Sequence, residues 1–233
     1  MLRTHKKTAI LYFALSQAEE SKQKPFFYHS TTQTALTNHF ENLSRKSGLD
    51  VFHYSEKEQI GTSFGERFAN AIESIYDKGY HSVITIGNDT PGLSLHHLHK
   101  AAQALEEDQF VLGPSIDGGF YLMGLKKEHF DKNQFIHFSW NTSKVCYEIR
   151  ESIASFTKNY LQLNYLGDID SILDVKRVFS TLGITKKKIF RLLQQFLNII
   201  SVLFSEEKRT LFSTTFRVNF NKGSPNYPHL LLF

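Results

Sequence analysis

Residues 87–91 (GNDTP) include a carboxylate, Asp89, and directly follow the predicted strand 81–86 (HSVITI). A carboxylate at the carboxyl end of a strand can hold a hard divalent cation through oxygen, and that cation can neutralise a diphosphate. Gly87 allows a ligand to approach the backbone closely. The segment also fits a plain strand-to-helix turn, because Gly, Asn, Asp and Pro are common turn residues. Spacing alone therefore leaves both interpretations of Asp89 open.

Residues 113–120 (GPSIDGGF) form a second candidate segment, with Asp117 followed by two glycines. Gly118 and Gly119 leave the backbone accessible to a ligand. Asp117 could accept hydrogen bonds from hydroxyl groups or act as a base. The alternative is a β-hairpin turn, which Asp-Gly favours.

Two further carboxylates, Asp168 and Asp170, lie two residues apart near the end of a predicted strand. In an extended segment such residues point the same way, so both could reach one cation. The alternative is that one of them caps the helix that follows.

Other reactive side chains carry weaker signals. His96, His97 and His99 fall in one predicted helix without an acidic cluster, so we expect surface histidines rather than a metal site. Cys146 follows no nucleophile signature and is expected to be a packing residue. The chain has no G-x-S-x-G, no Walker loop and no G-x-G-x-x-G, which argues against a hydrolase elbow, a P-loop NTPase and a dinucleotide dehydrogenase.

The elements that would position these residues alternate along the chain. Apolar runs predict strands at 8–15, 49–54, 81–86, 110–112, 120–125 and 160–166. Helical spacing predicts helices at 31–47, 64–78, 94–105, 143–157 and 170–182, and Ser63 with Glu66 forms a capping box. Such alternation is typical of an α/β fold with a mostly parallel sheet and helices on both faces. Ligands of such sheets bind outside the carboxyl ends of the strands.

Composition limits the class of protein. The 233 residues are 41% hydrophobic and 21% charged, as in ordinary globular proteins. Residues 184–233 hold eight Lys and Arg against two Asp and Glu, whereas the first 183 hold nineteen against twenty-one. The body therefore has no basic face for nucleic acid. A single cysteine favours a reducing, cytoplasmic compartment, and we expect neither a signal peptide nor a membrane-spanning helix.

Several segments together resemble a known family, and the resemblance covers roughly residues 8–182. They are residues 61–67 (GTSFGER), 81–93 (HSVITIGNDTPGL), 111–125 (VLGPSIDGGFYLMGL), 138–142 (FSWNT) and 167–171 (GDIDS). The family is the bacterial GT-A-like glycosyltransferases of the arsenosugar-biosynthesis type, in the nucleotide-diphospho-sugar transferase superfamily. Its members resemble in fold the guanylyltransferases of the molybdenum cofactor and of coenzyme F420.

The resemblance implies a three-layer, Rossmann-like GT-A domain over residues 1–183 that moves a sugar from a nucleotide-diphosphate donor. It places Gly87, Asn88 and Asp89 at the nucleotide, with Asp89 and Asp170 as contacts of Mg²⁺ or Mn²⁺. Asp117 would be catalytic, and Gly118 and Gly119 would line the sugar or acceptor site. Arg67 would face the ligand from a helix N-terminus, and Trp140 would pack on a sugar face. The acceptor would be a small molecule or a lipid.

One segment departs from the family pattern. The family has a proline-glycine loop with Lys-Thr-Arg-Leu after its first strand, and this loop cradles the phosphates. Here residues 16–24 (SQAEESKQK) lack the glycine and carry two acids. We expect a polar loop in which Lys22 or Lys24 could substitute. The departure keeps two alternatives open: a guanylyltransferase-like nucleotidyltransferase, and a non-catalytic protein that binds a nucleotide or sugar.

Residues 184–233 form a C-terminal extension of the body. Ile184–Phe204 is strongly amphipathic, and residues 211–220 are expected to form a strand. The helix could pack on the body, form a homodimer or partner interface, or lie on an anionic membrane surface. Packing on the body is the prediction that we favour, because apolar helix faces usually bury internally.

Overall fold

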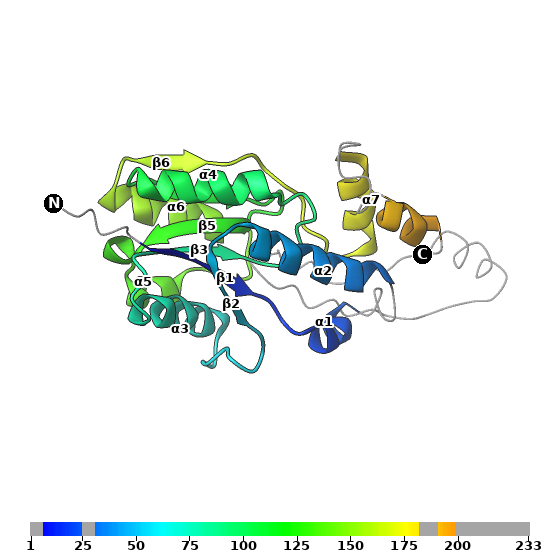
Figure 1. The fold of residues 1–233 in the computed structure, drawn as a ribbon, viewed down its shortest axis with the longest axis horizontal. Helices are drawn as coiled ribbons and strands as arrows, with labels where there is room; N and C mark the ends of the chain where they lie inside the picture. Colours follow the sequence, from blue (N-terminus) through cyan, green and yellow to red (C-terminus); the bar gives the residue numbers. More distant parts are fainter. Residues whose placement is uncertain (1–6, 25–30, 182–190, 199–233) are drawn as a thin grey trace.

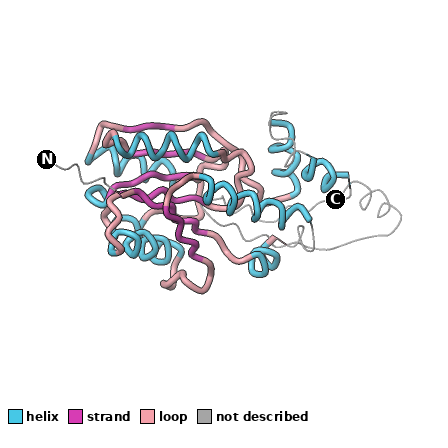
Figure 2. The backbone as a smooth tube through the Cα atoms, in the orientation of Figure 1, coloured by secondary structure: helices cyan, strands magenta, loops and turns pink. Residues whose placement is uncertain are grey.

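A computed structural model describes residues 7–24, 31–181 and 191–198 (Figures 1 and 2). These residues form one six-stranded sheet in the order β2-β1-β3-β5-β4-β6. The strands are β1 (Thr8–Phe13), β2 (Asp50–Tyr54), β3 (Ser82–Ile86), β4 (Phe110–Pro114), β5 (Phe120–Lys126) and β6 (Tyr160–Gln162). Only β5 runs antiparallel to its neighbours, so the prediction of a mostly parallel sheet is confirmed.

Helices cover both faces of the sheet. They are α1 (Gln17–Gln23), α2 (Thr31–Lys46), α3 (Phe64–Asp77), α4 (Leu95–Glu106), α5 (Lys132–His137), α6 (Val145–Phe156) and α7 (Ile172–Thr181). Side chains alternate along β1, as a strand requires. Ile10 and Tyr12 join the core formed with α2, α4 and α7, whereas Leu11 and Phe13 join the core formed with α3, α5 and α6. The predicted three-layer arrangement is therefore confirmed.

The helix α3 begins at the predicted capping box. The backbone N–H of Glu66 donates to Ser63 Oγ at 3.1 Å, and the N–H of Ser63 donates to Glu66 Oε2 at 3.2 Å. Phe68, Ile72 and Ile75 are buried on its inner face. These bonds satisfy backbone donors that the first turn of a helix otherwise leaves unpaired, and they fix where α3 starts.

The predicted loop at residues 16–24 is instead a helix, and this prediction was wrong. Ser16 is the N-cap of α1, and its Oγ accepts a hydrogen bond from Glu19 N at 3.4 Å. Glu19 and Glu20 occupy the first turn, where carboxylates interact favourably with the helix dipole. The seven residues of α1 are polar except for Ala18 and show no apolar periodicity, so the local pattern gave no helical signal. The short helix α5 was also not predicted.

Part of the C-terminal extension packs on the body. Residues 191–198 are helical, and Leu193 and Phe196 are buried in the core that α2, α4 and α7 share. The packing predicted for the whole amphipathic segment stays a prediction, because only residues 191–198 of it are described. The predicted strand at 211–220 and the boundary at 183 lie outside the described residues. No helix among the described residues is long and apolar enough to cross a membrane.

Candidate functional site

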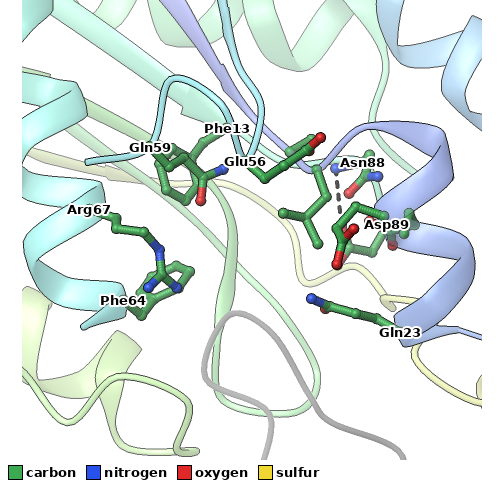
Figure 3. A pocket seen from close by; sticks show the side chains of 12 residues that line it. Phe13, Gln23, Glu56, Gln59, Phe64, Arg67, Asn88 and Asp89 are labelled. Atoms are coloured by element: carbon green, nitrogen blue, oxygen red, sulfur yellow. Dashed lines mark hydrogen bonds between the residues drawn. The ribbon is translucent and has the colours of Figure 1, made fainter. Parts of the chain in front are cut away.

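A cavity of about 460 Å³ opens at the carboxyl ends of β1 and β3 (Figure 3). Ala14 and Leu15 reach it directly after β1, and Asn88 and Asp89 reach it after β3. Its other lining residues are Phe13, Glu19, Glu20, Gln23, Glu56, Gln59, Phe64 and Arg67. The cavity therefore lies where an open α/β sheet binds ligands, and it brings together three predicted site residues, Arg67, Asn88 and Asp89.

Asp89 is held rigidly at the edge of this cavity. The Asn88 backbone N–H donates to Asp89 Oδ1 at 3.0 Å, and the Asp89 backbone carbonyl accepts a hydrogen bond from Ile169 N at 2.9 Å. Asp89 is only 6% exposed. The second bond ties the segment after β3 to the segment before α7, so it brings Asp168 and Asp170 beside Asp89.

Ser171 caps α7, so the capping alternative for Asp168 and Asp170 is wrong. Ser171 Oγ donates to Asp174 Oδ2 at 2.7 Å, and Asp174 N donates to Ser171 Oγ at 3.3 Å. Asp168 instead accepts a hydrogen bond from the Thr90 hydroxyl. Burial of its carboxyl group, together with the charges of Asp89, Asp117 and Asp170, raises the pKa of Asp168 to about 7.

Lys24, which stands at the end of α1, lies among these carboxylates. Its Nζ is 3.0 Å from Asp170 Oδ1, 3.2 Å from Glu20 Oε1 and 3.5 Å from Asp89 Oδ2. Nζ also donates to the Ile169 carbonyl at 2.7 Å. Burial acts to lower the pKa of Lys24, but the attraction of Asp170, Asp89 and Glu20 outweighs it and holds the pKa well above its ordinary value. Lys24 is therefore a charged, buried member of the site.

Residues 16–24 are the segment expected to cradle phosphates, and the first of them, Ser16, binds a carboxylate of the chain itself. Glu56 accepts hydrogen bonds from Ser16 N and Ser16 Oγ, both at 2.8 Å. These bonds lower the pKa of Glu56. The departure from the family pattern is thus accompanied by two internal pairings, of Ser16 with Glu56 and of Lys24 with the aspartates. Glu56 is a functional candidate that sequence reasoning did not assign to the site, and Lys24, considered there only as a phosphate-binding substitute, pairs with the aspartates instead.

The hairpin interpretation of residues 113–120 is confirmed, since β4 and β5 pair antiparallel around this turn. The Gly119 N–H donates to Asp117 Oδ1 at 2.9 Å. Gly118 has a φ of +95°, and a Cβ there would lie 2.3 Å from the Ser143 carbonyl oxygen. Gly118 is therefore required for the turn and for close packing on Ser143. Asp117, Gly118 and Gly119 are not among the residues that line the cavity.

Two further predicted site residues, Arg67 and Trp140, lie toward α3, and only Arg67 lines the cavity. Arg67 extends from α3, across the cavity from Asn88 and Asp89 (Figure 3). Its guanidinium makes no hydrogen bond or ion pair with any other residue that the structure describes. Trp140 is half-buried against Phe64 and Phe68, with ring centroids 5.1 and 5.2 Å away, and its Nε1 donates to the Phe135 carbonyl at 2.6 Å. Trp140 lines a second, smaller cavity with Gly87.

The histidine and cysteine predictions concern residues away from the cavity. His96 and His99 are exposed, and His97 Nδ1 accepts a hydrogen bond from Ser94 N at 3.1 Å. Burial raises the pKa of Cys146 to about 11, which disfavours the reactive thiolate. Within residues 7–24, 31–181 and 191–198, no three or more His, Cys, Asp or Glu are arranged as a ready metal site.

Comparisons with known proteins agree with this fold. The chain is similar to a candidate nucleotide-diphospho-sugar transferase from Desulfovibrio desulfuricans G20, with a TM-score of 0.64 and 20% identity over 81% of this chain and 97% of that chain. Weaker matches include Rv0371c from Mycobacterium tuberculosis H37Rv in complex with manganese (TM-score 0.44, 9% identity, 76% of this chain and 100% of that chain). Another is a cytidylyltransferase from Leptospira borgpetersenii (TM-score 0.39, 11% identity, 90% of this chain and 100% of that chain).

Comparison with protein-family models matches a shorter part of the chain than the comparison of structures does. No curated protein sequence matches it. The arsenosugar-type resemblance and the relation to guanylyltransferases stay predictions. The chain thus has the fold of the Desulfovibrio protein, and its residues 27–142 match the family described as "Uncharacterized protein conserved in bacteria (DUF2064)".

Proposed function

We propose that the chain is a transferase that binds a nucleotide-diphospho-sugar in the cavity beside Asp89 and moves the sugar to an acceptor. The observation that carries the proposal is the cavity of about 460 Å³ at the carboxyl ends of β1 and β3. Cavities of this size accommodate cofactor-sized ligands. The fold shared with the Desulfovibrio protein supports the same class of donor.

The charges around the cavity suggest an orientation for the donor. Arg67 is the basic residue among those that line it, and the acids Glu19, Glu20, Glu56 and Asp89 are the others that carry charge. A guanidinium binds phosphate oxygens through paired hydrogen bonds. Carboxylates accept hydrogen bonds from hydroxyl groups. We therefore assign the diphosphate to the space between Arg67 and Asp89, and the hydroxyl groups of the ribose or sugar to the other carboxylates of the lining, Glu19, Glu20 and Glu56.

The divalent metal of the proposal, Mg²⁺ or Mn²⁺, would be held by Asp89 and Asp170. Carboxylate oxygens are the ligands that these hard cations prefer. The ammonium of Lys24 already lies within 3.5 Å of Asp89 Oδ2 and 3.0 Å of Asp170 Oδ1, so the pair accommodates a cation. When bound, the metal would neutralise charge that develops on the departing diphosphate.

The reaction breaks the bond between the anomeric carbon and a phosphate oxygen and forms a bond from that carbon to an acceptor oxygen. The acceptor proton must pass to a base, and the diphosphate leaves with the bonding electron pair. Arg67 would bind the leaving group, where electrostatic stabilisation contributes most. Asp117 is the proposed base, and because it does not line the cavity, it would serve an acceptor bound beside the β4–β5 turn. Its carboxylate also supports the turn through Gly119 N, so its removal would affect both roles.

Thermal-shift measurements on the full chain test the donor site. We expect at least one nucleoside diphosphate or its sugar conjugate to raise the melting temperature, and Mn²⁺ to enlarge the rise. Asp89→Ala should remove the Mn²⁺-dependent part, whereas Glu151→Ala, on the exposed face of α6, should retain it. If no nucleotide or sugar nucleotide shifts the melting temperature of the unaltered protein, the proposal fails.

A non-catalytic binding protein is the second candidate, and the pairings of Glu56 with Ser16 and of Lys24 with the aspartates favour it. Each pairing occupies groups that a phosphate or a metal would otherwise contact. An assay for free nucleoside diphosphate separates this candidate from sugar transfer, since binding without turnover supports it. Release of pyrophosphate from a nucleoside triphosphate would indicate nucleotidyl transfer instead.

A further inference from the structure

Lys24 is a buried amine that touches two separate parts of the carboxylate cluster. Asp89 follows β3, and Asp170 precedes α7, yet Lys24 Nζ lies within 3.5 Å of a carboxylate oxygen from each. The third carboxylate, Glu20, is one turn back on α1, 3.2 Å from Nζ. A cation shared by Asp89 and Asp170 would have to lie in the place that this ammonium occupies.

An ammonium and a divalent cation cannot share this place. A metal bound to both carboxylates needs oxygen atoms at about 2.0–2.6 Å. It would then lie close to Nζ, and two positive charges at such a distance repel strongly in a buried site. Metal binding at Asp89 and Asp170 therefore requires Nζ to move away from them.

The surroundings of Lys24 leave room for exchange. Among the described residues, carboxylate oxygens of Glu20, Asp89 and Asp170 lie within 3.5 Å of its ammonium, and Glu20 and Asp89 also line the cavity. Lys24 stands at the C-cap of a seven-residue helix, whose residues Glu19, Glu20 and Gln23 line the cavity. A side chain that leaves the aspartates thus has an aqueous cavity next to it.

We propose that Lys24 is a tethered cation that competes with a divalent metal for Asp89 and Asp170. In the metal-free protein its ammonium pairs with the two aspartates, and metal binding displaces it. This inference rests on the proposed function, because the metal belongs to the donor site. It adds that the metal affinity of the site is set by a residue of the chain itself, so that Lys24 holds the site in a metal-free form until the divalent cation is abundant.

Binding of Mn²⁺ to the full chain, followed by the electron paramagnetic resonance signal of free Mn²⁺ without nucleotide, tests the competition. Lys24→Met should bind Mn²⁺ at least about tenfold more tightly than the unaltered protein, because the competing charge is gone. Lys22→Met, an exposed lysine on the same helix, should bind like the unaltered protein. Adding Asp89→Asn to Lys24→Met should abolish the gain. Equal or absent Mn²⁺ binding in both Lys24→Met and the unaltered protein overturns the proposal.

Amine labelling of the unaltered protein gives a second measurement that does not depend on the folding of a variant. Reductive methylation followed by mass spectrometry should modify Lys24 slowly without metal and faster at saturating Mn²⁺, while Lys22 is modified at the same rate in both. An unchanged Lys24 rate at saturating Mn²⁺ contradicts displacement. Both measurements omit nucleotide, so a failure of the proposed donor site and a failure of this competition give different results.

Discussion

Arg67 lines the cavity and Lys24 pairs with Asp89, which also lines it, and these two cations differ in their surroundings. Lys24 is 6% exposed, and its ammonium contacts Glu20, Asp89, Asp170 and the Ile169 carbonyl. Arg67 is half-buried, and its guanidinium makes no hydrogen bond or ion pair with other described residues. A buried charge is tolerated only when it is paired, whereas a partly hydrated charge needs no partner. Lys24 therefore belongs to the fold as well as to the site, and Arg67 is available to a ligand.

The difference follows from the two helices that carry these residues. Helix α1 is short, and Lys24 at its end is fixed mainly by long-range contacts, such as that with Ile169. Helix α3 has fourteen residues and a capping box, so Arg67 in its first turn has a well-defined backbone position without any partner for its side chain. We expect substitution of Lys24 to affect stability most and substitution of Arg67 to affect binding most.

The largest expected effect is that of Lys24→Met on stability. Removing one partner of a buried ion pair leaves the other charges uncompensated and typically costs about 3–5 kcal/mol. We therefore expect the free energy of unfolding, measured in urea with a chelator present, to fall by about this amount. Mn²⁺ should restore part of it, because a metal can replace the lost charge.

Lys22→Met is the matched control for this loss. Lys22 is on the same helix, and its ion pair with Glu19 is exposed, with 71% of the Lys22 side chain accessible. Exposed ion pairs contribute little to stability. The urea midpoint of Lys22→Met should equal that of the unaltered protein. A Lys24→Met protein as stable as this control would remove the distinction between the two cations.

The next largest effect concerns Asp168 and its dependence on pH. Its pKa is raised to about 7 in the folded protein, first by burial of its carboxyl group. The folded state therefore binds the proton more tightly than the unfolded state, whose carboxyl group titrates near pH 4. It follows that this residue lowers stability as pH rises from about 4 to about 7, with little further change above that range.

Asp168→Asn should remove this dependence. The asparagine mimics the protonated carboxyl group and can still accept the Thr90 hydrogen bond. At pH 8, with a chelator present, we expect an increase in the free energy of unfolding on the order of 2 kcal/mol, discounted for partial exposure. At pH 4 the variant and the unaltered protein should be equally stable. Equal stability at pH 8 as well would mean that the carboxyl group titrates normally.

Much of the fold could be predicted from the sequence. The apolar runs at 8–13 and 82–86 and the capping box at Ser63 are local signals, and each specified its element. Asp89 could be placed at the cavity because strand ends meet at one edge of the sheet. These predictions needed only neighbouring residues and one topological rule.

Lys24 could not be placed in the same way. Its partners Asp89 and Asp170 are distant in the sequence, and nothing in residues 16–24 indicates them. Ser171 was overlooked as the cap of α7 because the preceding aspartates are equally good capping residues. Gly118 looked like a ligand-facing glycine, but its need for space comes from Ser143, which only the tertiary structure brings there. Long-range contacts decided the cases of Lys24 and Gly118, whereas at Ser171 the choice lay between neighbouring residues with equal capping tendency.

Arg67→Gln tests the ligand side of the comparison. The loss of one charge-assisted interaction with phosphate typically costs about 1.5–3 kcal/mol, so a nucleoside diphosphate that binds the unaltered protein should bind about tenfold or more weakly. Isothermal titration calorimetry measures this, and Arg150→Gln, on the exposed face of α6, should bind as the unaltered protein does. The urea midpoint of Arg67→Gln should not change. A loss of stability without a loss of affinity would make Arg67 a structural residue.

The smallest expected effect is that of Ser63→Ala, and it tests why Arg67 can be held in place without a partner. Ser63 Oγ accepts the Glu66 N–H at 3.1 Å, one residue before Arg67. Loss of an N-cap costs about 1 kcal/mol, so the urea midpoint should fall slightly. Ser63→Asp keeps an acceptor and should behave as the unaltered protein. If the cap positions Arg67, Ser63→Ala should also weaken diphosphate binding, by less than Arg67→Gln does. If Ser63→Ala loses the expected stability of about 1 kcal/mol but binds the diphosphate unchanged, the first turn of α3 holds Arg67 by packing. The cap then serves the fold alone.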